Sequence, residues 1–280
     1  DNNVLNYRYD DGTKVEPDYY APIIPMICVN GGKGIGTGFS SEVPCFNVPD
    51  IINYIKFAID DEVKQEKPDI NLHYQDFVGT IKKISDMKYI LKGKYEIISS
   101  DEIHVTELPI GLWTDNFKEH LESLMDCKDQ KTKKKVSGLV KSYKDMSTDT
   151  LVDFKIKLQV GKIADLATQK ADDHQTKLEK LLKLTTTKSL TNMWLFDSKE
   201  QLNKYNSVYE IIDAYIPTRL GIYKSRIDYL IDVLEKEVII LTNKARFIKE
   251  QCDDIIDLRK KKKSDVIELL KERNYDIIND

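Results

Sequence analysis

Five glycines lie within the eight residues 31–38, and one bulky apolar side chain, Ile35, stands among them. Glycine allows a backbone to come close to a large ligand because it has no Cβ. Such segments often cradle phosphates, but an isoleucine in their midst favours a different task. Apolar side chains can be pushed between flat stacked groups, as they are between DNA base steps. The pattern therefore predicts an exposed Ile35 that acts as a wedge.

The glycine segment departs from the common nucleotide-binding motifs. Residues 34–38 read GIGTG, which is not G-x-G-x-x-G, and the chain contains no G-x-x-x-x-G-K-[ST]. A dinucleotide fingerprint opens a helix, whereas residues 40–44 form an extended stretch that ends in proline. A nucleotide-binding loop and a tight multiple turn without a ligand stay open as alternatives. Four nearby side chains could contact phosphates or simply be hydrated: Lys33, Thr37, Ser40 and Ser41.

Six of the eight prolines lie in residues 1–68, so the front of the chain is rich in turns and the back is helical. Helices are predicted over 47–58, 113–125 and around 178–184. Strands are predicted over 77–81, 88–91, 95–98, 103–108 and 154–160, with the first four forming an antiparallel meander.

A long helical pattern begins at Ser207. After Pro217, apolar residues recur at intervals of three and four from Ile227 to Cys252, which is typical of a coiled-coil seam. Residues 224–256 as one helix would span about 50 Å. The lysines at 260–263 are predicted to end this helix before another begins at Ser264. The alternative is a long helix that lies on its own globular domain.

The charge balance argues against a free nucleic-acid-binding domain. The chain has 280 residues, enough for one large or two modest domains, and a net charge of −4. Residues 1–60 carry four basic and eight acidic side chains, the wrong sign for nucleic acid. Residues 128–135 hold five lysines, which form either a solvated loop or a phosphate-contacting patch.

The four cysteines, at positions 28, 45, 127 and 252, form no C-x-x-C pair, so we expect no zinc site. Scattered thiols fit a reducing compartment. The sequence has no apolar run of transmembrane length and no signal peptide, so no membrane partner is expected. Because the chain starts at Asp1 without a methionine, we expect a fragment of a longer protein.

A family resemblance rests on the segment 16–44, EPDYYAPIIPMICVNGGKGIGTGFSSEVP, which closely resembles the DNA-cleavage core of eukaryotic-type DNA topoisomerase II (type IIA). Further blocks follow in the same order: GTIKKISDMKYILKGKYEII, VTELPIGLWTDNFKEHLESL, SLTNMWLFDSKEQLNKYNSVYEIIDAY and RLGIYKSRIDYLIDVLEKE. The resemblance covers nearly all 280 residues and is weaker over 126–148 and the last 30. Phe39 departs from it, since tryptophan is common there in cellular enzymes. Divergence in the coiled-coil region suggests a version from a protist or a large DNA virus.

The resemblance implies an α+β fold. Residues 1–20 would end a winged-helix region. Residues 21–206 would form a tower domain of antiparallel strands and helices that carries the DNA-facing glycine loop. Residues 207–280 would form a long helical coiled-coil arm and the start of the exit-gate tip.

By the same resemblance, Ile35 intercalates between base pairs of double-stranded DNA, and neighbouring residues bind the duplex: Lys33, Gly34, Gly36, Thr37 and Ser40. The nucleophilic tyrosine, the acidic metal-binding cluster and the ATPase domain would lie upstream. We therefore expect no catalytic residue and no bound metal or cofactor in this fragment, which would be inactive alone. Tyr19 and Tyr20 are interpreted as packing residues, and Asp10 with Asp11 as a turn.

The whole enzyme would use ATP and Mg²⁺ to pass one duplex through a transient break in another. It would be a homodimer through its exit gate. The expected location is the nucleus for a cellular protein, and the host cytoplasm or the virion for a viral one. The alternative function is a non-catalytic scaffold, in which a small α/β domain sits on a dimerising coiled coil without a DNA role.

Overall fold

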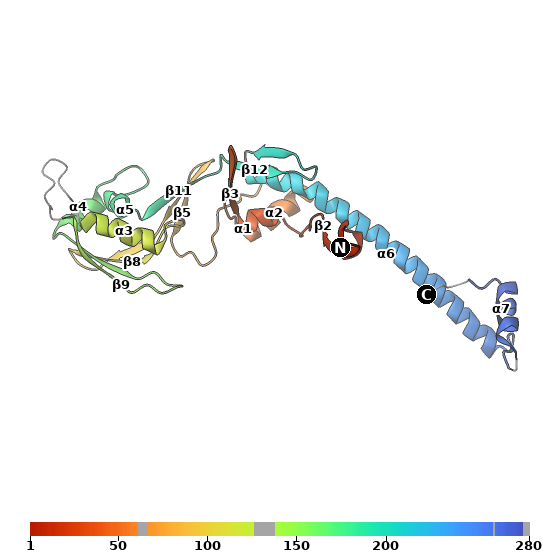
Figure 1. Ribbon diagram of the computed structural model, residues 1–280. Helices are drawn as coiled ribbons and strands as arrows, with labels where there is room; N and C mark the ends of the chain where they lie inside the picture. Colours follow the sequence, from red (N-terminus) through yellow and green to blue (C-terminus); the bar gives the residue numbers. More distant parts are fainter. Residues whose placement is uncertain (61–65, 126–137, 260, 277–280) are drawn as a thin grey trace. The chain divides into compact units, whose positions relative to one another are not determined.

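The computed structural model describes residues 1–60, 66–125, 138–259 and 261–276 (Figure 1). The chain divides into two compact units. One unit combines Asp1–Ile23 with Ile216–Asp280, and the other is Ile24–Tyr215. The predicted domain boundaries at 20/21 and 206/207 stay predictions. The lysine-rich patch at 128–135 lies outside the described residues.

The unit Ile24–Tyr215 contains most of the regular structure. Its helices are α1 (Met26–Asn30), α2 (Val48–Ile59), α3 (Thr114–Met125), α4 (Lys162–Thr168) and α5 (Lys177–Leu181). Its strands are β3 (Gly32–Gly36), β4 (Phe39–Val43), β5 (Thr80–Ser85), β6 (Lys88–Lys92), β7 (Lys94–Ile97), β8 (Glu102–Glu107), β9 (Val140–Asp145), β10 (Phe154–Leu158), β11 (Thr185–Ser189), β12 (Met193–Phe196) and β13 (Leu202–Tyr205).

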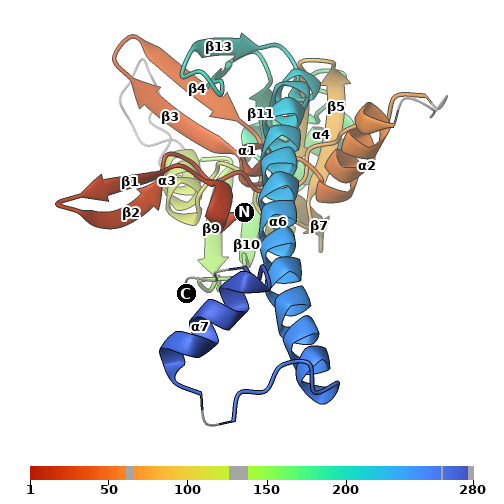
Figure 2. The same ribbon diagram turned by 90° about the vertical axis from the view of Figure 1, so that its right-hand side faces the viewer.

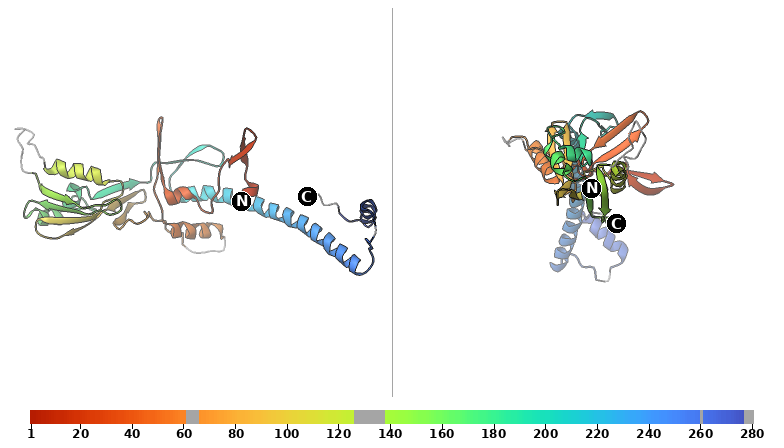
Figure 3. Two further views of the ribbon diagram at one scale, coloured as in Figure 1. Left: turned by 60° about the horizontal axis from the view of Figure 1, so that its bottom comes forward. Right: turned by 90° about the vertical axis from the view of Figure 1, so that its left-hand side faces the viewer.

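A four-stranded antiparallel sheet, in the order β7-β8-β10-β9, carries the main core. Alternate residues of β8 and β10 are fully buried, as period-two patterning requires: Ile103, Val105, Phe154, Ile156 and Leu158. Helices α3, α4 and α5 contribute buried apolar side chains to the same core, and Figure 3 shows α3 lying along one face of this sheet. The predicted helix over 113–125 and strand over 154–160 are thus confirmed, with their ends shifted by one or two residues.

A separate three-stranded sheet has the order β11-β6-β5. The predicted single meander over 77–108 is therefore wrong, because β6 and β7 belong to different sheets. Gly93 links them where the chain runs tightly past β8, since a Cβ at Gly93 would lie 2.3 Å from the carbonyl oxygen of Glu107. The first predicted strand also starts later than expected, at Thr80 instead of Phe77.

Helix α2 follows its sequence signals closely. Asn47 is the N-cap, and its side chain accepts a hydrogen bond from the backbone N–H of Asp50. Ile51 and Tyr54 are buried, and the Tyr54 hydroxyl donates to Asp213 at 2.8 Å. Ile52, which was predicted to lie on the apolar side, is exposed.

The other unit is built from both ends of the chain. It contains η1 (Asn2–Val4), β1 (Tyr7–Asp10), β2 (Thr13–Pro17), most of α6 (Val208–Cys252) and α7 (Lys263–Glu272). Asp11 and Gly12 turn β1 into β2 with positive φ angles, which confirms the predicted turn. Arg219 of α6 is buried and donates to the Asp1 carboxylate and to the Ala21 carbonyl, both at 2.6 Å.

Helix α6 runs unbroken for 45 residues with Pro217 inside it. It ends at Cys252, four residues before the end of the predicted span 224–256, so the prediction that the lysines at 260–263 end it is wrong. Helix α7 lies beside the C-terminal end of α6 (Figure 2). Glu250 of α6 holds the residues that follow α7, because its carboxylate accepts hydrogen bonds from Arg273 at 3.2 Å and Tyr275 at 3.0 Å, besides one from Arg246 of α6 at 2.8 Å. The predicted helix start near Ser264 is confirmed.

The apolar seam of α6 is exposed in the described structure. Six residues at three-and-four spacing each have between 44% and 61% of their surface accessible: Ile227, Leu230, Leu234, Val238, Leu241 and Ile248. The mixed α and β content and the antiparallel sheets agree with the predicted fold class, whereas the coiled coil stays a prediction. None of the helices in the described ranges combines the length and apolarity needed to cross a membrane.

Candidate nucleic-acid interface

The glycine segment forms a β-hairpin. Strands β3 and β4 pair antiparallel, with Gly36 opposite Phe39, so Thr37 and Gly38 make a two-residue turn. Gly38 has φ of 81°, a conformation that glycine adopts without steric cost. The expected glycine loop is thus a strand–turn–strand unit, and no helix follows it. The nucleotide-binding alternative required a helix there and is not supported.

The base of the hairpin is anchored in buried structure. Cys28 of α1, Val43 and Phe46 are buried, and the backbone N–H of Phe46 donates to the Cys28 carbonyl at 2.8 Å. Burial raises the pKa of the Cys28 thiol to about 12, so this cysteine stays protonated and packs as an apolar residue. A Cβ at Gly31 would lie 2.8 Å from the Val43 carbonyl oxygen, which requires glycine where α1 meets the hairpin.

Most of the predicted DNA-contacting side chains share one face of the hairpin. Since Lys33 pairs with Glu42 and Ile35 pairs with Ser40, these four side chains lie on the same side. Ser41 lies on the opposite side, opposite Gly34. Ile35 has 85% of its surface exposed, the largest fraction among the exposed large apolar side chains of the described residues. The expected exposure of Ile35 is confirmed.

Four of the five glycines fall into two groups by backbone conformation and by the space around them; at the fifth, Gly32, a Cβ would lie 3.0 Å from the Ile27 side chain. Gly31 and Gly38 have positive φ angles, so the chain's own conformation accounts for them. A Cβ at Gly34 would meet no heavy atom within 4 Å, and for a Cβ at Gly36 the nearest atom would lie at an ordinary 3.8 Å. Neither has a positive φ. Nothing in the described structure requires glycine at 34 and 36, which is the pattern expected where an outside partner approaches the backbone.

A second segment braces the outer edge of β4. The backbone N–H of Glu42 donates to the Asn192 carbonyl at 2.8 Å, and the Asn192 side-chain amide donates to the Ser40 hydroxyl at 2.9 Å. The backbone N–H of Trp194 donates to the Ser41 hydroxyl at 3.1 Å. The Trp194 and Phe39 rings pack in a T-shaped arrangement, with centroids 5.8 Å apart. The hairpin is therefore held by β12 and the residue before it.

One carboxylate, that of Glu42, lies on the Ile35 face of the hairpin between two lysines. Glu42 forms an ion pair with Lys188 of β11 and lies opposite Lys33. The hydrogen bond from Lys188 lowers the pKa of the Glu42 carboxyl, and the positive charge of Lys33 acts in the same direction. Lys33 is exposed and close to Ile35, so it is a cation on this face that a phosphate could reach.

Other predicted residues have different surroundings. Tyr19 and Tyr20, interpreted as packing residues, are both exposed, so that interpretation is wrong for this chain. In the described ranges, no group of three or more His, Cys, Asp or Glu residues is placed to hold a metal ion.

Two residues that hold the hairpin, Asn192 and Trp194, were not predicted from the sequence. Their contacts join residues far apart in the chain, and such contacts leave no local pattern.

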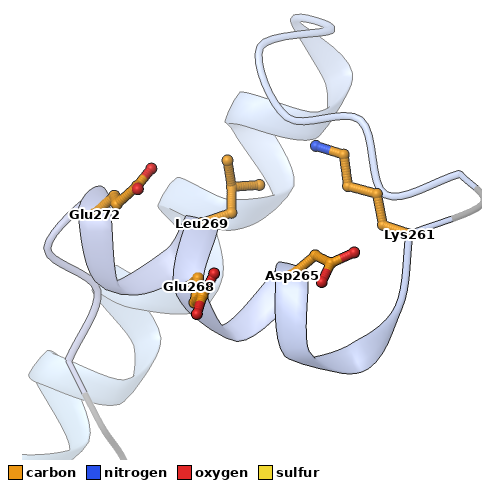
Figure 4. Close-up of a pocket in the computed structure, with 5 residues that line it drawn as sticks. All are labelled: Lys261, Asp265, Glu268, Leu269 and Glu272. Atoms are coloured by element: carbon orange, nitrogen blue, oxygen red, sulfur yellow. The ribbon is translucent and has the colours of Figure 1, made fainter.

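A pocket of about 240 Å³ lies on α7 and does not belong to this interface (Figure 4). Asp265, Glu268 and Glu272 line it together with Leu269, and Lys261 is the cation at its edge. Three carboxylates against one ammonium group give a negative surface. Such a surface repels phosphate, so we exclude this pocket as a nucleic-acid site.

Comparison with known proteins places the chain in a family. The family model for the DNA gyrase/topoisomerase IV A subunit matches residues 1–280. The chain is 37% identical over 265 residues to DNA topoisomerase 2 of Bombyx mori, covering 94% of this chain and 16% of the relative. It is 36% identical to human DNA topoisomerase 2-alpha, covering 99% of this chain and 17% of that protein. With DNA topoisomerase 2 of Plasmodium falciparum the identity is 38%, over the whole chain and 19% of the relative.

A solved structure agrees with these sequence relationships. The crystal structure of the Plasmodium falciparum topoisomerase II DNA-binding, cleavage and re-ligation domain superposes with a TM-score of 0.81 at 37% identity. The superposition covers 98% of this chain and 35% of that one. The chain therefore spans less than a fifth of the curated relatives it matches and about a third of the solved domain. The chain belongs to the type IIA DNA topoisomerase family, as a segment of its cleavage core.

Proposed function

We propose that this segment bends the DNA of a type II topoisomerase by inserting Ile35 between base pairs. The observation that carries the proposal is an isoleucine with 85% of its surface exposed on a hairpin whose two flanking glycines, Gly34 and Gly36, have no role in packing this chain. An exposed isoleucine is unfavourable in water, so its position is better explained by an apolar partner. Stacked bases provide such a partner.

The expected energetics support a wedge. A smooth bend over a 20–30 base-pair site costs about 1–6 kcal/mol. An apolar side chain that unstacks one step concentrates this deformation at one place. Glycines on either side of Ile35 let the strand approach the groove without Cβ collisions, while Lys33 and Ser40 on the same face contact phosphates. Thr37 lies in the turn and is exposed, so we assign it to the same contact.

The activity proposed for the whole protein is passage of one DNA duplex through a transient double-strand break in another, driven by ATP. We propose that the nucleophilic tyrosine, the ATPase domain and the ligands for Mg²⁺ belong to parts of the enzyme outside this chain. The described residues offer no ligand set that fits Mg²⁺. No step here is therefore derived through the metal.

The long helix supports a second part of the proposal. The exposed seam of α6 is suited to a second helix, and we propose that α6 is one strand of a coiled-coil arm that leads to a dimeric exit gate. Two copies of the chain would be related by two-fold symmetry there. The proposed location is the nucleus, or the host cytoplasm or virion if the protein is viral.

The decisive experiment replaces Ile35 by Ala in the intact enzyme and measures DNA bending by energy transfer between dyes at the two ends of a duplex. We expect the bend and DNA cleavage to fall, while the melting temperature stays near that of the wild type because an exposed side chain leaves no cavity. Leu121→Ala, in the core, is the matched control for loss of stability. Unchanged bending and cleavage in Ile35→Ala would overturn the proposal and favour a scaffold without a DNA role.

A further inference from the structure

The outer edge of β4 makes a backbone hydrogen bond to the residue that precedes β12. Strand β4 pairs with β3 on one side, and on the other side the backbone N–H of Glu42 donates to the Asn192 carbonyl at 2.8 Å. Asn192 follows β11 and precedes β12. Leu190, two residues before Asn192, is buried, and its backbone N–H donates to the Met87 carbonyl at 2.9 Å. Asn192 is therefore held by the three-stranded sheet, and it holds the hairpin in turn.

The direction of the hydrogen bond to the Ser40 hydroxyl decides whether that hydroxyl can still donate to another group. A hydroxyl group has one proton to donate and two lone pairs to accept. The Ser40 hydroxyl accepts from the Asn192 amide at 2.9 Å, so this contact uses a lone pair and leaves the proton free for another partner. Phosphate oxygens only accept hydrogen bonds. The Ser40 hydroxyl can therefore accept from Asn192 and still donate its proton in a hydrogen bond to a phosphate oxygen.

Ser40 is also the cross-strand neighbour of Ile35, and its side chain is exposed on the same face. The Ser40 hydroxyl therefore lies beside Ile35, the proposed wedge. Ser41, whose hydroxyl accepts from the Trp194 backbone at 3.1 Å, is partly buried on the opposite face. Of the two adjacent serines, Ser40 is therefore the one whose proton can reach a ligand that surrounds Ile35.

We propose that Asn192 is a positioning residue for DNA bending. It fixes the edge of the wedge hairpin through its backbone carbonyl, and its side chain directs the Ser40 proton towards a DNA phosphate beside Ile35. This inference rests on the proposed role of Ile35. It adds a residue that does not touch the DNA itself and lies more than 150 positions away in the sequence.

The first test compares Asn192→Ala with Asn203→Ala in the intact enzyme. Asn203 is the matched control, because its side-chain amide also donates to neighbouring acceptors, the Asp197 carboxylate at 2.9 Å and the Gln201 carbonyl at 3.5 Å, next to the turn between β12 and β13. DNA bending at saturating enzyme, the apparent Kd and the melting temperature are measured for each. We expect Asn192→Ala to reduce the bent fraction and DNA cleavage about three- to ten-fold, the effect of one net hydrogen bond. Asn203→Ala should bend DNA as the wild type does.

A second variant separates proton direction from stability. Asn192→Asp keeps an acceptor beside Ser40 and loses the donor, so the Ser40 proton turns towards the carboxylate and is no longer available to a phosphate. We expect Asn192→Asp to keep the melting temperature and to bend DNA less well than Asn192→Ala. Gln201→Glu, an isosteric change at an exposed position of the neighbouring turn, controls for the added negative charge.

A double variant tests whether the two residues act together. If Asn192 acts through Ser40, Ser40→Ala combined with Asn192→Ala should bend DNA no less than Ser40→Ala alone. Wild-type bending in both Asn192 variants, with bending lost in Ile35→Ala, would overturn this inference and leave the proposed function standing. Wild-type bending in Ile35→Ala would instead overturn the proposed function. Bending by Asn192→Ala that recovers fully on cooling would identify a role in stability alone and would also overturn the inference.

Discussion

The ring of Trp194 meets the ring of Phe39 edge to face, with centroids 5.8 Å apart and planes 70° from each other. Phe39 is the first residue of β4, directly after the turn, and Trp194 lies in β12, more than 150 residues later. The contact fastens the hairpin near its tip, whereas Asn192 fastens it along its edge. The hairpin that carries Ile35 is therefore braced at two points.

The aromatic pair should show measurable coupling. Edge-to-face pairs contribute about 0.5–1.5 kcal/mol beyond the area they bury. We expect a double-mutant cycle of Phe39→Leu and Trp194→Leu to give a coupling free energy in this range, measured by urea unfolding. Additive effects of the two substitutions would show that the rings stabilise the hairpin independently.

The two groups of glycines should respond in opposite ways to alanine. Gly34→Ala meets no neighbouring atom and needs no positive φ, so it should leave the free energy of unfolding unchanged or raise it by about 0.4–1 kcal/mol. Gly38→Ala, at φ of 81°, should cost about 1–2 kcal/mol. In the intact enzyme, DNA cleavage should fall in Gly34→Ala in spite of its stability. Full cleavage activity in Gly34→Ala would mean that no partner approaches the backbone there.

The ion pair between Glu42 and Lys188 should make the hairpin sensitive to acid. The hydrogen bond from Lys188 holds the pKa of the Glu42 carboxyl below its ordinary value of 4.5. A carboxyl with a lowered pKa in the folded state stabilises that state above its unfolded pKa, and the stabilisation is lost as the pH falls through the folded value. Because both side chains are partly exposed, with 33% and 23% of their surfaces accessible, the contribution at neutral pH is at most about 1 kcal/mol.

The measurement is the difference in unfolding free energy between wild type and Glu42→Gln, at neutral pH and at about pH 3, below the unfolded pKa of a glutamate. The difference should shrink on acidification, because protonated Glu42 resembles glutamine. Other carboxyls titrate equally in both proteins and cancel. A difference that stays constant across this interval would show that the pair contributes nothing that depends on ionisation.

The exposed seam of α6 should cause self-association of the chain when it is produced alone. Apolar surface left in water costs about 25 cal/mol per Å², and six seam residues are each at least 44% exposed. We expect weak or heterogeneous association in sedimentation over a concentration series. Replacing Leu234 and Leu241 by Lys should abolish it without loss of helix content. A tight dimer that survives both substitutions would place the contact elsewhere.

Local patterns predicted the parts of this fold that depend on neighbouring residues. The cap at Asn47, the alternation over 103–108 and the three-and-four spacing after Pro217 each specify an element through contacts within a few positions. The exposure of Ile35 was predicted because the glycines around it have no side chains with which it could form a core. These features were expected because the forces that produce them act over one or two turns of chain.

Long-range pairing could not be predicted in the same way. The strands on either side of Gly93 have equivalent patterns, yet β6 and β7 enter different sheets, and a Cβ at Gly93 would collide with the Glu107 carbonyl oxygen at 2.3 Å. The hydrogen bond between Asn192 and Ser40 joins two polar residues that are ordinary in their local sequence. Such partners are selected by the packing of whole sheets, which a single sequence does not display.

Arg219 binds Asp1 and Ala21, so the unit that contains the long helix is completed by residues from the very beginning of the segment. The intervening residues, Ile24–Tyr215, form a unit of their own. During translation, residues 1–23 therefore leave the ribosome about 190 residues before Arg219 does, which at 5–20 residues per second is roughly 10–40 seconds. Throughout that interval Asp1 and the Ala21 carbonyl lack their partner Arg219. The order of synthesis thus supplies all residues of the inserted unit before those of the helical unit are complete.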